Sequence, residues 1–259
     1  MTRQQLGMLA LALLRGLLYF TVLIGISQAL VALNANLSPD IPWFPIPALG
    51  VIWIVTLWVK RRWDLRLAPP TGIAAGKVYA VALLATVAGM SVSVIEAAYH
   101  GLTRSAPLWP GEVSTAFQLT FLLVLPLIAS VLAEVGYRGL IQTPFEKLVP
   151  LWPMLFFIAV INALFHFYDP DQASQWIRFI SLNLAFGYVT WLSQSIIPAL
   201  IAHIAMNIVE PVSEYLFGPV AMGELSPTTM VVITMLGLTA LILAIVIARG
   251  VQKPIFNAT

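Results

Sequence analysis

Long apolar segments, separated by short polar ones, make up almost the whole of this 259-residue chain. A helix needs about 20 apolar residues to cross the hydrocarbon core of a bilayer. Segments close to that length are 7–33, 44–60, 77–97, 115–136, 151–167, 176–192, 195–213 and 227–249. The pattern therefore predicts an all-α, polytopic integral membrane protein of about eight transmembrane helices, which form a single transmembrane domain over residues 1–259.

The composition supports this class of protein, because 60% of the residues are hydrophobic and only 9% are charged. The mean hydropathy of +0.92 exceeds what a soluble core requires. The net charge of +2 is too small for a nucleic-acid footprint, so we expect the lipid bilayer, and no nucleic acid, as a partner. The chain has no cysteine, which excludes disulfides and a thiol nucleophile. Any metal must therefore bind to nitrogen or oxygen ligands.

The lysine and arginine residues between the apolar segments predict how the chain is oriented. Positive residues are enriched in the cytoplasmic loops of membrane proteins. Those that fall on one side here are Arg3, Lys60, Arg61, Arg62, Arg66, Lys77, Arg138, Lys147, Arg249 and Lys253. We therefore expect both termini of this multi-pass protein in the cytoplasm. We also expect it in a prokaryotic inner membrane.

Polar side chains interrupt several of the apolar segments: Glu134, Arg138, His166, His203 and Asn207. An ionisable group at the centre of a transmembrane helix costs about 2.5–3.5 kcal/mol on insertion scales, so such groups are candidates for a functional site. Glu96, by contrast, lies near the outer end of its segment, where we expect water to reach it.

Two pairs among these residues have the spacing of neighbours on one helical face. Glu134 and Arg138 are four residues apart and can pair, which also allows a purely structural ion pair. His203 and Asn207 have the same spacing, which could serve a metal or an oxyanion hole. A single intramembrane histidine is more often a hydrogen-bonded packing residue, so His203 alone would decide nothing.

His166 has Asn162 one turn before it, as a potential hydrogen-bond partner. By itself it also fits a packing role. The chain has only three histidines, and His166 and His203 both lie in late segments, downstream of the Glu134 and Arg138 pair. This coincidence favours a shared site over independent packing roles.

Together these motifs resemble the CPBP intramembrane proteases, which include the CAAX-prenyl endopeptidases of the Rce1 type and the bacterial Abi proteins. The family pattern is Glu-Glu-x-x-x-Arg on one helix, Phe-x-x-x-His on the next and His-x-x-x-Asn on a later one. Here the first element is 133–139 (AEVGYRG), the second 162–166 (NALFH) and the third 203–207 (HIAMN). Asn162 replaces the usual phenylalanine, and the third element matches in full. The resemblance covers a family-like catalytic core of about residues 115–210.

The first element departs from the family pattern at Ala133, where the first glutamate of the pair is expected. The resemblance implies that this glutamate activates the hydrolytic water, so the general base is missing. We interpret the chain as an engineered, inactive form of a protease in preference to a natural pseudoprotease. Glu134 could serve as base instead, but neighbouring helix positions point about 100° apart, so the helix would have to shift.

For the active protease from which this chain would derive, the resemblance implies an endopeptidase that cleaves membrane-associated peptides or proteins by an activated water. Asn207 and His203 would stabilise the oxyanion, and Arg138 would hold Glu134. His166 would position the water or, with His203, bind a divalent metal such as zinc. Two histidines and an asparagine are few ligands for catalytic zinc, so a metal-free glutamate protease stays an alternative.

Two other classes of protein fit parts of the pattern. A non-catalytic membrane scaffold would keep both histidines for packing and would need no base at position 133. A transporter is a weaker hypothesis, supported by Pro198 and Pro211 around His203 but by no internal repeat. Straight helices would place Glu134, His203 and His166 at different depths, so a shared site requires a tilt or a kink, for example near Pro126.

Overall fold

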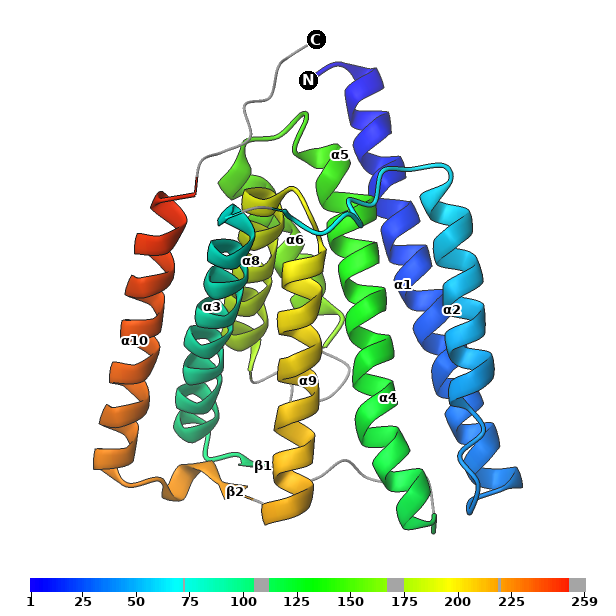
Figure 1. Cartoon of the computed structure of the whole chain (residues 1–259), viewed down its shortest axis with the longest axis vertical. Helices are drawn as coiled ribbons and strands as arrows, with labels where there is room; N and C mark the ends of the chain where they lie inside the picture. Colours follow the sequence, from blue (N-terminus) through cyan, green and yellow to red (C-terminus); the bar gives the residue numbers. More distant parts are fainter. Residues whose placement is uncertain (72, 105–111, 167–174, 219, 252–259) are drawn as a thin grey trace. The chain divides into compact units, whose positions relative to one another are not determined.

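The computed structural model describes residues 1–71, 73–104, 112–166, 175–218 and 220–251 (Figure 1). Within these ranges every apolar segment of the sequence corresponds to a helix. The helices are α1 (Arg3–Leu37), α2 (Pro45–Lys60), α3 (Ile73–Tyr99), α4 (Thr115–Ala133), α6 (Leu151–Leu164), α8 (Trp176–Ser193), α9 (Ile197–Phe217) and α10 (Pro227–Arg249). The prediction of an all-α fold is confirmed. Residue 167, at the end of one predicted segment, and Lys253 lie outside the described residues.

Shorter elements complete the described part of the chain. Helix α4 continues into a π-helix, η1 (Glu134–Gln142), and a short helix, α5 (Thr143–Phe145). Two-residue strands, β1 (Thr103–Arg104) and β2 (Val220–Ala221), form a small sheet, and the 3-10 helix η2 (Met222–Glu224) follows β2.

The long helices have the dimensions of membrane spans. The helical stretches that are long and apolar enough to cross a bilayer are Arg3–Leu37, Ala74–Tyr99, Thr115–Phe145 and Pro227–Arg249. Helices α2 and α6 are apolar but shorter. Exposed leucine, isoleucine and valine side chains cover much of α1 and α10, as expected for surfaces that face lipid. The chain is a polytopic integral membrane protein.

Local sequence explains where α1, α4 and α10 begin. The Thr2 hydroxyl accepts a hydrogen bond from the Gln5 amide, and the Gln5 side chain accepts one from the Thr2 amide. This capping box starts α1 at Arg3, earlier than the apolar pattern predicts. Ser114 and Ser226 cap α4 and α10 in the same position.

The described residues group into two compact units. Unit 1 comprises Met1–Leu65, Arg104–Met154 and His203–Val220, and contains α1, α2, α4, η1, α5 and most of α9. Unit 2 comprises Arg66–Thr103, Leu155–Ala202 and Ala221–Thr259, and contains α3, most of α6, α8 and α10. The single transmembrane domain stays a prediction.

In unit 1, α1 packs closely against η1 (Figure 1). Gly16 of α1 lies against η1 where Gly136 and Ile141 approach it, and a Cβ atom at Gly16 would lie 2.7 Å from the Gly136 carbonyl oxygen. A contact of that length with backbone cannot be relieved by a side-chain rotation. The two glycines therefore allow the helix that carries Glu134 to lie directly on α1.

The Gly16→Ala variant is expected to be less stable than the parent chain by about 1–3 kcal/mol, because the added methyl group overpacks the α1–η1 contact. Thermal unfolding in detergent measures this change. Gly25→Ala is the matched control on the same helix, because a Cβ atom there meets nothing within 4 Å. Equal stability of the two variants would contradict the close packing.

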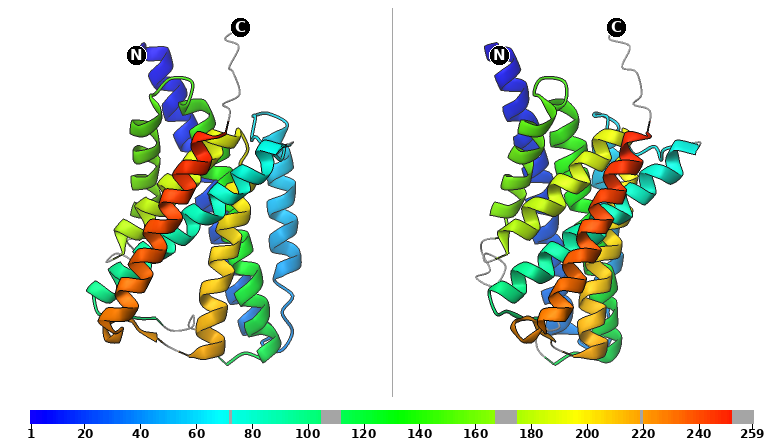
Figure 2. Two further views of the ribbon diagram at one scale, coloured as in Figure 1. Left: turned by 60° about the vertical axis from the view of Figure 1, so that its left-hand side comes forward. Right: turned by 90° about the vertical axis from the view of Figure 1, so that its left-hand side faces the viewer.

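In unit 2, α3 packs against α8 and α10, and Figure 2 shows α3 and α10 side by side. Glu96 near the end of α3 is only 6% exposed, so the expectation that water reaches it is wrong. Its carboxylate accepts hydrogen bonds from the backbone amides of Ile177 (3.0 Å) and Arg178 (2.8 Å) at the start of α8. Glu96 therefore caps α8 from another helix and compensates for its unpaired first amides.

We expect Glu96→Ala to destabilise the protein by about 1–2 kcal/mol, because the first amides of α8 lose their acceptor. Thermal unfolding in detergent is again the measurement. Glu224→Ala removes a carboxylate from a short 3-10 turn and serves as the control. If both variants unfold at the temperature of the parent chain, the cap contributes nothing to stability.

Candidate functional site

Helix α4 changes its hydrogen-bonding pattern at Glu134. Ala133 is the last residue of α4, and the nine residues Glu134–Gln142 form the π-helix η1, whose residues are all buried. Regular α-helix was expected through residue 136. π-Helical turns are rare in proteins, but those that occur often lie at functional sites, because they rotate the side chains that follow them.

Glu134 lies at the centre of a buried cluster in unit 1. Its Oε2 atom is 3.6 Å from Arg138 Nε, which confirms the pairing that the spacing predicted. Its Oε1 atom is 2.8 Å from Nδ1 of His203 on α9. Glu134 and Arg138 are each 1% exposed, so this carboxylate and this guanidinium compensate each other away from water.

A second contact joins α4 and α9 one helical turn away. Asn207 Nδ2 donates a hydrogen bond to the Ser130 hydroxyl (3.1 Å), and that hydroxyl donates to the carbonyl of Pro126 (2.8 Å). Ser130 was not among the site residues predicted from the sequence. Its position one turn before Glu134 is the signal that could have identified it, because residues four apart share a helical face.

The structure therefore brings Glu134, Arg138, His203 and Asn207 together. The expectation that Glu134 and His203 lie at different depths is wrong, since two of their side-chain atoms are 2.8 Å apart. That Glu134 could act as base only after a shift of the helix stays a prediction. The Glu134 side chain points to His203 in this fold, at the position where the α-helix gives way to η1.

Ala133 lies beside this cluster in the sequence and is 6% exposed. That Ala133 replaces a glutamate of the family pattern stays a prediction. Glu134 is the carboxylate that contacts His203 in the chain as it stands.

His166 belongs to unit 2 and is described there. Its Nδ1 atom is 3.0 Å from the main-chain carbonyl oxygen of Asn162, the partner that the spacing suggested. The imidazole stacks on Phe179, with ring centroids 3.9 Å apart. The Asn162 side-chain oxygen accepts a hydrogen bond from Asn183 (2.7 Å). A role for His166 in catalysis or metal binding stays a prediction.

Within the described ranges, no three His, Cys, Asp or Glu side chains gather in an arrangement that could hold a metal ion. His203 directs Nδ1 at the Glu134 carboxylate, and Asn207 directs its amide nitrogen at Ser130. Catalytic zinc usually takes three protein ligands. Zinc binding by His166 and His203 stays an untested prediction.

An apolar helical protein with a buried Glu–Arg–His–Asn cluster belongs to the membrane proteins that have ionisable groups inside the helical bundle. Residues 115–209 of this chain match the family of the type II CAAX prenyl endopeptidase Rce1-like proteins. The resemblance in the motifs is thereby confirmed for this segment, which contains Ala133 and all five polar residues named above. The matched family is a protease family. Neither a search of curated proteins nor one of solved structures gave a match.

Proposed function

We propose that this chain has the scaffold of an intramembrane endopeptidase that hydrolyses membrane-associated peptides or proteins, and that it is inactive because Ala133 replaces the general base. The observation that supports this proposal is the buried contact between Glu134 and His203, inside the segment that is Rce1-like. This contact fixes the orientation of the His203 imidazole on Glu134, the residue that follows position 133.

The Glu134 carboxylate gives His203 a defined role. In the proposed mechanism Glu134 is the acceptor of this pair, and Nδ1 of His203 donates to it. The carboxylate thereby fixes the ring orientation and compensates positive charge on the imidazole. In the imidazolium form, Nε2 also carries a proton and donates to a developing oxyanion.

Asn207 is held in a similar way. One N–H of its carboxamide donates to Ser130, which fixes the side chain on α9. A carboxamide nitrogen has two donors, so the second N–H can donate to the same oxyanion. Fixed donors of this kind stabilise a tetrahedral intermediate without reorganising during the reaction.

The reaction would follow the usual steps of amide hydrolysis. A carboxylate at position 133 takes a proton from water, and the resulting hydroxide attacks the peptide carbonyl carbon. His203 and Asn207 stabilise the oxyanion. The C–N bond then breaks, and the carboxylic acid at position 133 returns its proton to the leaving amine. Arg138 is a positioning residue, because it acts by holding Glu134. The methyl group of Ala133 can accept no proton.

A second candidate for the base is Glu134, and the 2.8 Å contact with His203 favours it. Against this role, the same carboxylate already pairs with Arg138 and is 1% exposed. A general base must lie within hydrogen-bond reach of the attacking water. We therefore assign the base to position 133 and a supporting role to Glu134.

A non-catalytic scaffold is the alternative that Ala133 itself favours. In that case the contacts of Glu134, His203 and Asn207 would only hold α4, η1 and α9 together. A transporter is less well supported, because the sequence has no internal repeat.

The experiment that tests the proposal is cleavage of a membrane-tethered peptide library by four purified proteins. These are the parent chain, Ala133→Glu, Glu134→Gln and the double variant. Cleavage that appears only with Ala133→Glu supports the proposal, and cleavage by the parent chain that Glu134→Gln abolishes assigns the base to Glu134. No cleavage by any variant favours the scaffold or the transporter. A chelator added to each assay tests the prediction of zinc.

A further inference from the structure

A cavity of about 450 Å³ lies in unit 1, apart from the polar cluster. Figure 1 shows that the start of α1, the end of α2 and α5 lie at one end of this unit. The residues that line the cavity come from α1, the loop after α2, η1, α5 and the turn after α5: Met8, Leu11, Ala12, Arg15, Arg62, Trp63, Asp64, Gly139, Leu140, Thr143, Pro144, Lys147 and Leu148. Its volume is within the range of about 300–1,000 Å³ that small-molecule sites occupy.

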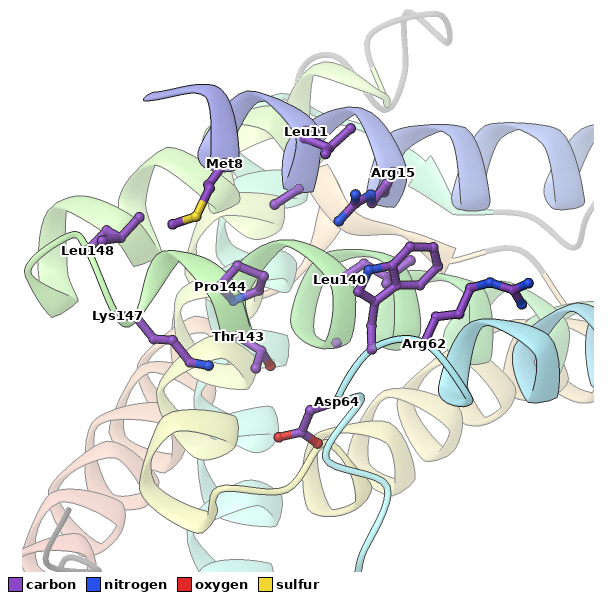
Figure 3. A pocket seen from close by; sticks show the side chains of 13 residues that line it. Met8, Leu11, Arg15, Arg62, Asp64, Leu140, Thr143, Pro144, Lys147 and Leu148 are labelled. Carbon is purple, nitrogen blue, oxygen red and sulfur yellow. The ribbon is translucent and has the colours of Figure 1, made fainter. Parts of the chain in front are cut away.

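The polar part of the lining is mainly cationic. Arg15 and Lys147 contribute positive charges and Asp64 contributes a negative charge (Figure 3). The Arg62 guanidinium is directed away from the cavity and lies 4.1 Å from the centroid of the Trp58 ring. Within the described ranges, Arg15 and Lys147 make no ion pair with a carboxylate. A lining with this excess of positive charge is suited to an anion.

Arg15 is the residue that most requires an explanation. It lies within α1, an apolar helix that is long enough to span a membrane, where a charge is costly. Its guanidinium carbon lies 4.7 Å from the centroid of the Trp63 ring, a cation–π contact that holds it at the cavity. The Trp63 ring only reduces the free-energy cost of burying the Arg15 charge. A phosphate of a bound ligand would compensate that charge.

The rest of the lining is apolar and continues into the surface that faces lipid. Met8 and Leu11 line the cavity from α1, and both are exposed, as are Leu6, Leu14 and Leu18 along the same helix. Figure 3 shows Met8 and Leu11 along α1, while Asp64 and Lys147 lie on the other side of the α5 segment. A ligand that fits both parts has an anionic head and an apolar tail.

We propose that this cavity binds the phosphate headgroup of an anionic phospholipid, with an acyl chain along the exposed face of α1. Positively charged pockets between transmembrane helices at the cytoplasmic surface bind such headgroups, and anionic lipids are abundant in that leaflet. The cavity lies at the end of unit 1 that has Arg3, Lys60 and Arg61. This is the end that the charge distribution predicts to be cytoplasmic. A free phosphate would use the cations but not the apolar wall.

The test is native mass spectrometry of the full-length protein, titrated with phosphatidylglycerol or with phosphatidylcholine. We expect phosphatidylglycerol to bind more tightly than phosphatidylcholine. Removal of one cation near a lipid surface weakens binding by about fivefold, so Arg15→Gln combined with Lys147→Gln is expected to weaken it by about 30-fold. The control combines Arg3→Gln with Arg61→Gln, which removes the same charge at the same end but outside the cavity. We expect less than about a threefold change in this control.

A misfolded variant would bind lipid less tightly, so a variant that binds phosphatidylglycerol more tightly cannot be explained by misfolding. Asp64→Asn removes the negative charge from the lining and is expected to raise the affinity for phosphatidylglycerol by about fivefold. Excess inorganic phosphate should not displace the lipid, and displacement by phosphate would assign the cavity to a free anion. Equal binding of the two lipids, equal losses in the cavity and control variants, or no gain in Asp64→Asn would each overturn the proposal.

Discussion

The Glu134→Ala variant is expected to be about 3–5 kcal/mol less stable than the parent chain. Truncation of one member of a buried ion pair leaves the other charge uncompensated, and Arg138 is 1% exposed. The same change removes the acceptor of the His203 Nδ1 atom and so weakens the contact between η1 and α9. Thermal and denaturant unfolding in detergent would measure the loss.

Glu146→Ala is a suitable control, because Glu146 also accepts a hydrogen bond from a residue four positions away, Gln142. Glu146 is only half-buried, so we expect a loss below about 1 kcal/mol. A double variant, Glu134→Leu with Arg138→Leu, removes both charges. It should be more stable than the variant with Glu134→Leu alone and the variant with Arg138→Leu alone. Losses that simply add in the double variant would show that the two residues do not interact.

The helices of the fold were predictable, because each is determined by the length and hydrophobicity of its own segment of sequence. Each apolar segment, such as 227–249, is as long as a membrane span and forms a helix over nearly the same residues. The pairing of Glu134 with Arg138 was also predictable, since four residues along a helix bring two side chains to one face. The ends of helices were harder to predict. Helix α1 starts earlier than the apolar pattern predicts, because Thr2 and Gln5 form a cap.

The contacts between distant residues were not predictable from helical spacing. Glu134 and His203 are separated by 69 positions, and their contact depends on how α4, η1 and α9 pack. Apolar patterns also do not reveal a π-helix, because nine buried residues look the same in either geometry. For these reasons straight α-helices placed Glu134 and His203 at separate depths, whereas the structure places them in contact.

The Ala133→Glu variant is expected to cleave its substrate about 10²–10⁴ times faster than the parent chain, the range that a positioned general base contributes. Because residue 133 is 6% exposed, the new carboxylate also enters a nearly closed space. We expect the variant to be about 1–3 kcal/mol less stable, as is common where a functional group is buried. Initial cleavage rates and unfolding temperatures of the same preparations would measure both effects.

Ala133→Gln is the matched control, because its side chain has almost the same size and polarity but cannot accept the proton from water. It should lose stability as Ala133→Glu does and gain no activity, so the two effects separate. Equal rates for the two variants would mean that position 133 acts by shape or hydration rather than as a base. A rate gain that disappears when Glu134→Gln is added would show that Glu134 must hold His203 for the base to act. The buried cluster of η1 and α9 would then position His203, and the residue at position 133 would take the proton from water.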